Sequence, residues 1–172
     1  MPENASQLVA IVPMRMAWVQ QAWDCLSSVI QERQYLAMLV PPKLEKSREY
    51  IQFLVENDYP YYVAWLPGEN RVVGWCDVHP NALEAFAHCG ILGIGVHKDF
   101  RSDGIGDLLI QSALRHCHRI RLERVELNVY RSNPNAMGLY LKHGFIVEGV
   151  KVRGRKVDGR YDDVIGMVRF NP

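Results

Sequence analysis

A glycine-containing loop in the middle of the chain has the composition of an anion-binding site. In the stretch GIGVHKDFRSDGIGDLL, this loop lies between an expected strand and an expected helix. Glycine allows positive φ angles and a close approach to the backbone, so that consecutive N–H groups can point into one hollow. The first turn of the helix adds unpaired N–H groups and the positive end of its dipole. The loop could therefore hold a pyrophosphate, although an ordinary strand-to-helix turn could have the same glycines. Its residues are Arg101, Ser102, Asp103, Gly104, Ile105 and Gly106.

Histidine and cysteine residues give no metal site in this sequence. His116, Cys117 and His118 are adjacent, but residues two apart on a helix point to nearly opposite sides and cannot converge on one ion. The four cysteines have no paired spacing and lie in apolar stretches. Reduced, buried thiols of a cytoplasmic protein account for them best. We therefore expect neither a metal nor a disulfide framework.

Seven strands and four helices are expected to position the loop. Apolar periodicity predicts helices over 16–33, 44–56, 104–120 and 133–144. In the second helix, Tyr50, Phe53 and Leu54 are expected to point inward. The turn PGEN predicts that the strands before and after it pair as a hairpin. Strands are expected over 8–12, 61–66, 71–78, 88–97, 124–130, 145–150 and 160–170.

Length and element order indicate one domain. A chain of 172 residues can bury a core without disulfides or metals, and no linker or repeat divides it. Two helices followed by a strand-rich centre with helical crossovers indicate an α/β or α+β architecture on a mixed sheet. We therefore expect a single domain over 1–172.

The charge balance gives no electrostatic reason to expect nucleic acid or an anionic membrane as a partner. The chain has 20 basic and 19 acidic residues, for a net charge of +1. The N-terminal apolar run is too short for a signal core or a membrane span. Five basic residues gather near the C-terminus, where a solvated face is the expected role: Lys151, Arg153, Arg155, Lys156 and Arg160.

Two motifs resemble those of the GNAT superfamily of acyl-CoA-dependent N-acyltransferases. RSDGIG resembles the family motif R/Q-x-x-G-x-G/A, and LGIGV resembles the strand that leads into it. ELNVYRSNPNAMGLYLKHGF resembles the motif N-x-x-A-x-x-L-Y-x-x-x-G-F. The closing EGV and DGRYDDVIGM resemble the ending of members that act on amino acids and other small amines. The resemblance covers about 71–170, and the fixed points of the second motif are Asn133, Ala136, Leu139, Tyr140, Gly144 and Phe145.

This resemblance implies a fold and a cosubstrate. The fold would be a mixed, mostly antiparallel seven-stranded sheet flanked by about four helices and splayed at its central strands. The pantetheine arm of acetyl-CoA would lie in the splay, paired with the backbone of Ile94, Gly95 and Val96. Gly93 and Gly95 would leave room for it and suit a bulge. The loop from Arg101 to Gly106 would hold the pyrophosphate, and Asn133 would contact the coenzyme.

The resemblance also suggests catalytic groups. It implies that Tyr140 protonates the departing thiolate, and a half-buried core tyrosine is the alternative. The family glutamate of many protein N-terminal acetyltransferases is replaced here by Asn128. Two candidates for the base remain open. One is His88, on the strand before the loop, and the other is Asp77, whose apolar surroundings can raise its pKa. His88 could equally be a surface residue and Asp77 a structural acceptor, while a relaying water would need neither.

The expected reaction is transfer of acetyl from acetyl-CoA to a primary amine by direct attack in a ternary complex. The preferred acceptor is a small molecule such as an amino acid, and a homodimer is compatible with the sequence. Aromatic residues of the N-terminal half mostly suit the core, and a few could line an acceptor site. These are Trp18, Trp23, Tyr35, Tyr50, Tyr59, Tyr61 and Tyr62.

Three other functions compete with a small-molecule acetyltransferase. A protein N-terminal or lysine acetyltransferase belongs to the same class, and Asn128 counts against one common type. A non-catalytic acyl-CoA-binding module belongs to another class, and the presence of Tyr140 disfavours it. A dinucleotide-binding oxidoreductase is excluded because the loop lies mid-chain and lacks the full G-x-G-x-x-G motif.

Overall fold

A computed structural model describes residues 9–171 of the chain. Seven strands and four main helices follow one another in the predicted order. The helices are α1 (Val19–Gln31), α2 (Leu44–Glu56), α3 (Ile105–Arg119) and α4 (Pro134–Lys142). The strands are β1 (Ala10–Pro13), β2 (Tyr61–Leu66), β3 (Arg71–Pro80), β4 (Cys89–Val96), β5 (Arg124–Tyr130), β6 (Ile146–Val157) and β7 (Arg160–Phe170).

Several boundaries differ from those predicted. The first helix opens with a 3-10 turn, Met16–Trp18, before α1 begins at Val19. β4 begins at Cys89, so His88 precedes the strand. β6 extends to Val157 and takes up most of the basic residues that were expected after a shorter strand. At the N-terminus, the predicted strand began at residue 8, which lies outside the described residues.

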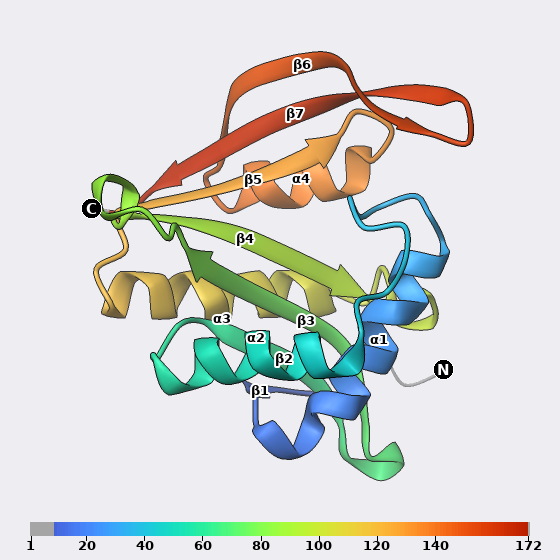
Figure 1. Cartoon of the computed structure of the whole chain (residues 1–172), viewed down its shortest axis with the longest axis vertical. Coiled ribbons are helices and arrows are strands. Elements are labelled where there is room, and N and C mark those ends of the chain that lie inside the picture. The colour runs from blue at the N-terminus through green and yellow to red at the C-terminus, as the bar shows by residue number, and fades with distance from the viewer. Residues whose placement is uncertain (1–8, 172) are drawn as a thin grey trace.

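The strands form one mixed sheet in the order β1-β2-β3-β4-β5-β7-β6. All neighbouring strands are antiparallel except β4 and β5. This parallel pair joins only Cys89, Gly90 and Ile91 to the first residues of β5, and beyond Ile91 the two strands diverge (Figure 1). The backbone of β4 from Leu92 onward is therefore unpaired on its β5 side, which confirms the expected splay.

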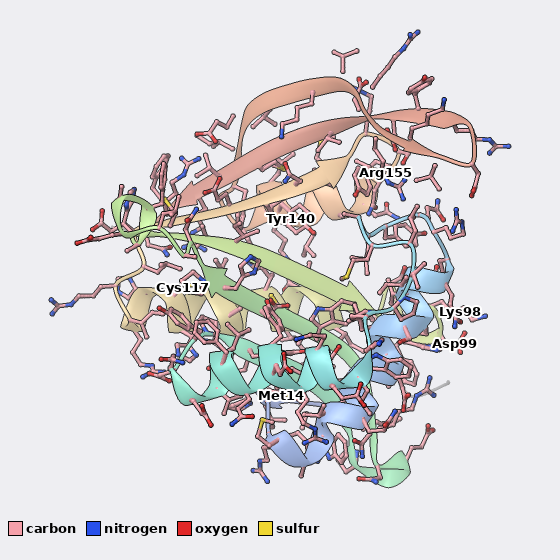
Figure 2. All side chains as sticks on the ribbon, viewed as in Figure 1. Met14, Lys98, Asp99, Cys117, Tyr140 and Arg155 are labelled. Carbon is pink, nitrogen blue, oxygen red and sulfur yellow. The ribbon has the colours of Figure 1, made fainter. Side chains whose placement is uncertain are left out.

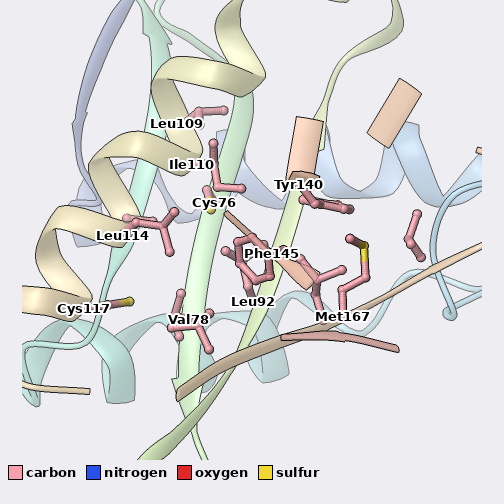
Figure 3. Close-up of a cluster of buried hydrophobic side chains, with 14 of the residues drawn as sticks. Cys76, Val78, Leu92, Leu109, Ile110, Leu114, Cys117, Tyr140, Phe145 and Met167 are labelled. Carbon is pink, nitrogen blue, oxygen red and sulfur yellow. The ribbon is translucent and has the colours of Figure 1, made fainter. Parts of the chain in front are cut away.

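Helices cover the two faces of the sheet and divide the core into two clusters. On one face, α3 and α4 pack on the sheet around Cys76, Leu92 and Tyr140, as Figure 3 shows. On the other face, α1 and α2 pack over β2 and β3, with Trp75 in that cluster. Neighbouring residues of β3 thus point into different layers, as the alternation of side chains along a strand requires.

The inward face of α2 was only partly predicted. Leu54 is fully buried, whereas Phe53 is 48% exposed and packs on Tyr59. Tyr50 is also partly exposed, and only its hydroxyl end reaches the interior. Within residues 9–171, no helix is long and apolar enough to span a membrane.

Candidate functional site

A cavity of about 560 Å³ opens where β4 and β5 diverge. Its lining joins the end of β4, the loop before α3, the end of β5 and one side of α4. Figure 2 shows Tyr140 in the space between the diverging strands. Nine of the residues singled out in the sequence line it together: Ile94, Gly95, Val96, Arg101, Ser102, Gly104, Gly106, Asn133 and Tyr140.

The loop at the wide end of the cavity has the conformation of an anion-binding nest. Ser102 and Gly104 have positive φ angles of 67° and 81°, and α3 begins directly after Gly104. The first helical hydrogen bond runs from the N–H of Leu108 to the carbonyl of Gly104, at 3.2 Å. The N–H groups between these two residues therefore have no partner within the helix, and this end of the cavity suits a phosphate.

The two predicted loop residues that do not line the cavity have other positions. The side chain of Ile105 is buried in the core, and Asp103 is absent from the lining. Asp107, in the first turn of α3, does reach the cavity. Its negative charge is offset by Lys142 at 2.7 Å and by His143 at 2.9 Å, and its pKa is lowered mainly by the hydrogen bond to Lys142.

The Arg101 side chain is fully engaged within the protein. Its Nε donates to the carbonyl of Val96 at 2.9 Å, and its two terminal nitrogens donate to the carboxylate of Glu32 at 2.8 and 2.5 Å. The guanidinium group also stacks over the ring of Tyr35, 4.7 Å from its centroid. Arg101 therefore fixes the loop to β4 and to the end of α1, and its contribution to an anion site is through the loop geometry.

Helix α4 presents two predicted residues to the cavity. Asn133 caps the helix by accepting a hydrogen bond from the N–H of Ala136 at 3.2 Å. Tyr140 is 7% exposed, and its ring packs against Phe145 with centroids 5.9 Å apart. Burial raises the pKa of Tyr140, and the nearby Cys76 thiol acts in the same direction. The phenol therefore stays protonated at neutral pH and can act as a proton donor.

Two glycines of β4 make room for side chains of β3. A Cβ atom at Gly95 would lie 2.2 Å from the Trp75 ring, and one at Gly93 would lie 3.1 Å from Oδ1 of Asp77. β3 and β4 pair in continuous register from Gly74 with Val96 to Pro80 with Gly90, so the expected bulge was wrong for this pair. These glycines instead let Trp75 and Asp77 lie across β4, on the face covered by α1 and α2.

Asp77 is a buried carboxyl group, 6% exposed, that does not line the cavity and lies on β3, the strand next to β4. Its neighbour across the strands, Gly93, lies two residues beyond Ile91, the last residue of β4 paired with β5. The hydroxyl group of Tyr50 donates a hydrogen bond of 2.5 Å to Oδ2 of Asp77. Burial raises the pKa of Asp77 to about 6, against the lowering effect of the hydrogen bond from Tyr50.

His88, the other predicted base, lies at the far end of β4. It is exposed and precedes the strand, and its backbone carbonyl accepts hydrogen bonds from the N–H groups of Glu123 and Arg124. Six residues separate it from Ile94, the nearest lining residue of β4, which corresponds to about 20 Å along a strand. The structure therefore does not bring His88 to the cavity.

The β6–β7 hairpin reaches the α1–α2 connection, and Figure 2 shows Arg155 on it there. Arg155 stacks on the cavity-lining Tyr130 at 4.2 Å and donates to the carbonyl of Arg33 at 2.9 Å. The Arg33 side chain in turn pairs with Asp158, at 2.7 and 3.0 Å. The basic residues of this hairpin are otherwise exposed, as predicted, but Arg155 has a structural role that sequence reasoning missed.

Asn128, at the position of the absent glutamate, borders two hollows. It lines the main cavity and also a second cavity of about 390 Å³, which lies between β4, β5 and β6. Ile91, Glu126 and Glu148 are among the other residues of the second cavity. The second cavity therefore adjoins the narrow end of the splay, where Ile91 makes the last pair between β4 and β5.

Sequence reasoning missed three residues of the site. Glu32 and Tyr35 hold Arg101, and Tyr50 holds Asp77. Tyr35 was named only within a larger set of aromatic residues, and Tyr50 was named there and as an inward residue of the second helix. No local pattern marks Glu32, because its partner lies 69 residues away in the chain.

A model of the acetyltransferase (GNAT) family matches residues 19–145, most of the chain and both motifs. The chain belongs to the GNAT family. Over 108 residues it is 29% identical to the L-amino acid N-acetyltransferase AaaT of Escherichia coli, covering 62% of this chain and 65% of that protein. The match therefore spans slightly less than two thirds of this relative.

Two solved structures have the same fold. The phosphinothricin acetyltransferase of Sinorhizobium meliloti, in complex with acetyl-CoA, superposes with a TM-score of 0.88 at 18% identity, covering 95% of this chain and 89% of that one. The ribosomal-protein-alanine N-acetyltransferase of Brucella melitensis has a TM-score of 0.85 at 19% identity, covering 94% and 99%. The GNAT fold predicted from the sequence is thereby confirmed.

Proposed function

We propose that this GNAT protein transfers the acetyl group of acetyl-CoA to the primary amine of a small molecule, by direct attack in a ternary complex. One observation carries the proposal. The cavity has a nest for an anion at its wide end and Tyr140 in its lining. A buried carboxyl group, Asp77, lies on β3 opposite Gly93, close to where β4 leaves β5.

The residues of this cavity fit acetyl-CoA. The nest from Ser102 to Gly106 would hold the pyrophosphate, and the unpaired backbone of Ile94 and Val96 would pair with the pantetheine arm. Asn133 would border the same arm. An arm that starts at the nest and follows β4 brings its thioester, the electrophile of the reaction, toward the narrow end of the splay. Asp103 and Ile105 would contribute through their backbone only.

Tyr140 and Asp77 are the acid and the base of the proposed mechanism. An ammonium group must lose a proton before its nitrogen can attack the thioester, and the departing thiolate must gain one. Cys76 and Asp77 are consecutive in β3 and point to opposite faces. Tyr140 packs with Cys76 on one face, while Asp77 meets Tyr50 on the other. The proposed donor to the thiolate sulfur and the proposed acceptor from the amine nitrogen thus lie on opposite faces of the sheet. His88 is disfavoured as the base by its distance from the cavity.

A free amino acid or a similar small amine is the proposed acceptor. The Escherichia coli relative is named for L-amino acids and the Sinorhizobium meliloti neighbour for phosphinothricin, which are small acceptors. The net charge of +1 offers no general attraction for a basic peptide, and Asn128 replaces the glutamate of one common protein-modifying type.

A protein N-terminus is the second candidate acceptor, and the name of the Brucella melitensis neighbour favours it. A non-catalytic acyl-CoA-binding module is the alternative from another class. The cytoplasm is the proposed compartment, since Cys25, Cys76, Cys89 and Cys117 are all buried free thiols. The homodimer stays a prediction, and light scattering would test it.

A screen of thiol release from acetyl-CoA tests the proposal. Free amino acids, polyamines and peptides are supplied in turn, with Asp77→Asn, His88→Ala and Tyr140→Phe alongside the wild type. We expect the wild type to acetylate at least one free amine. Of the three variants, only His88→Ala should keep the turnover of the wild type. Turnover with peptides alone would move the acceptor to the protein class. Binding of acetyl-CoA without turnover on any acceptor would favour the non-catalytic module.

A further inference from the structure

Asp77 stands in an unusual electrostatic position for a buried carboxyl group. Among residues 9–171, no lysine or arginine lies within ion-pair distance of it, and its one basic neighbour is His79, with Nδ1 4.0 Å from Oδ2. Tyr61 and Cys76 lie close by, but burial raises the pKa of both well above the ordinary values, so they stay neutral. A buried carboxylate usually has a cationic partner. Within residues 9–171, an ionised Asp77 therefore has no lysine or arginine partner to offset its charge, which favours its role as a proton acceptor.

A chain of hydrogen bonds leads from Asp77 toward the surface. The Tyr50 oxygen is 2.5 Å from Oδ2 of Asp77 and 3.2 Å from Nδ1 of His79. The rings of Tyr50 and His79 meet edge to face with centroids 6.0 Å apart. The side chain of Asp77 is 9% exposed and that of His79 is 38% exposed. The chain of polar atoms thus begins at a closed position and ends at one that water can reach.

Among residues 9–171, no other hydrogen-bonded side chain leads from Asp77 to the surface, since Trp75, whose hydrogen bond also lowers the pKa of Asp77, is buried. Its strand neighbours across the pairs are Tyr61 on β2 and Gly93 on β4, and Tyr61 is buried among apolar residues. Gly93 is followed by Ile94, which lines the cavity that acetyl-CoA and the acceptor would fill during the reaction. A base that takes one proton in every cycle must release that proton before the next cycle.

We propose that Tyr50 and His79 form the exit path for the proton that Asp77 removes from the acceptor ammonium group. This inference rests on the proposed function and extends it to two residues outside the cavity. Tyr50 and His79 are positioning and relay residues, because neither touches the reacting atoms.

Asp77, Tyr50 and His79 can together carry the proton from the acceptor to water. An N–H bond of the acceptor breaks and an O–H bond forms on Asp77. The carboxyl proton then passes to the Tyr50 oxygen while the Tyr50 proton passes to Nδ1 of His79, in the tautomer that carries its proton on Nε2. The imidazolium releases the Nε2 proton to water, and exchange with water restores the starting tautomer. Burial lowers the pKa of His79, which favours this release.

His79→Ala tests the outer end of the path. We expect kcat with the best amine to fall by about 10²-fold, the lower end for a positioned proton-transfer group, while the KM for acetyl-CoA stays unchanged. Added imidazole should restore turnover in a concentration-dependent way, because a diffusible base can replace an exposed one. His88→Ala is the matched control, because it changes an exposed histidine that precedes β4 and lies away from the cavity. Unchanged kcat in His79→Ala, or loss without rescue, would overturn the relay.

Tyr50→Phe tests the inner link, with Tyr59→Phe as the control. Removing the hydroxyl takes away a hydrogen bond that lowers the pKa of Asp77, so the rising limb of the pH–rate profile should move to higher pH. The double variant Tyr50→Phe with His79→Ala should be no slower than Tyr50→Phe alone, because both changes interrupt one path. Losses that multiply in the double variant, or an unshifted limb, would contradict the inference.

Different results would exclude the acetyltransferase activity and the proton path. If the wild type acetylates no amine, the proposed function is wrong, and so is the proton path through Tyr50 and His79. If the wild type acetylates an amine and Asp77→Asn abolishes this, while Tyr50→Phe and His79→Ala leave kcat and the pH profile unchanged, only the relay fails.

Discussion

The guanidinium group of Arg101 and the carboxylate of Glu32 form a two-bond ion pair that joins the loop before α3 to the end of α1. Both side chains are mostly buried, with 29% and 24% of their surface exposed. A carboxylate so close to an anion-binding loop would repel coenzyme A if charge alone decided affinity. The geometry indicates instead that Glu32 favours binding by holding the loop in place.

The Glu32→Gln variant distinguishes charge repulsion from stabilisation of the loop, because the two effects would change the affinity for acetyl-CoA in opposite directions. We expect it to weaken acetyl-CoA binding by about 3- to 10-fold, which corresponds to roughly 1 kcal/mol for a partly buried pair. Isothermal titration calorimetry measures this. Glu49→Gln removes the same charge from the exposed face of α2 and should leave the affinity unchanged. Tighter binding by Glu32→Gln would show that simple repulsion dominates.

Gly106→Val tests the nest. A Cβ at Gly106 would contact only Leu139, at 3.4 Å, so we expect the variant to fold. The added methyl groups would stand over backbone N–H groups that face the cavity, and acetyl-CoA affinity should fall by at least about tenfold, or 1.4 kcal/mol. Gly68→Val, at a turn with open space around it, is the control. Wild-type affinity in a folded Gly106→Val protein would remove the nest from the site.

Tyr140→Phe keeps the ring that packs on Phe145 and removes only the hydroxyl group. We expect turnover to fall by about 10²- to 10⁴-fold, the usual range for a general acid. Thermal stability and acetyl-CoA affinity should change little. Tyr161→Phe, on the exposed hairpin, provides the comparison. If Tyr140→Phe turns over as fast as the wild type, the tyrosine is a packing residue.

Asp77→Asn should make the protein more stable while it makes it inactive. The pKa of Asp77 is about 6 in the folded protein and 3.8 for an ordinary aspartate. The folded state therefore holds the proton more firmly, so the wild type loses stability as pH rises from about 4 to 6 and stays penalised above pH 6. Removing the charge should add about 1 to 3 kcal/mol at pH 8, following the linkage between pKa and stability.

Denaturant unfolding of the wild type and Asp77→Asn at pH 4 and pH 8 measures this difference. We expect the two proteins to be most alike at pH 4 and to differ most at pH 8. A variant that is less stable than the wild type at pH 8 would mean that the carboxylate stabilises the fold, and the account of Asp77 as a strained functional group would be wrong.

The sequence predicted the elements and the wide end of the site well, since local patterns carry that information. The glycines of RSDGIG, the periodicity of α3 and the Asn133 to Phe145 motif all lie within short windows. The splay was predicted only through the family resemblance, because nothing local shows that β4 and β5 part after three pairs.

The narrow end of the site was harder to predict because it depends on contacts between distant residues. Tyr50 meets Asp77 across 27 positions of the chain, and the hydrophobic pattern of α2 suggested only a core tyrosine. Gly93 and Gly95 looked like bulge residues, since no sequence pattern reveals that two side chains of the neighbouring strand lie across them. His88 was a candidate because alternation along β4 gives the face of a residue but says nothing of how far it lies from the reacting atoms.

The contact of Gly93 with Asp77 and of Gly95 with Trp75 has an evolutionary consequence. Each glycine shares one volume with the side chain opposite it, so the four positions cannot vary independently. A homologue with a side chain at 95 must carry a smaller residue at 75, and one with a side chain at 93 must displace the carboxyl group at 77 by a few tenths of an ångström or replace it. In an alignment, the first pair would covary by size, whereas the second would separate homologues that take their base from β3 from those that need another source.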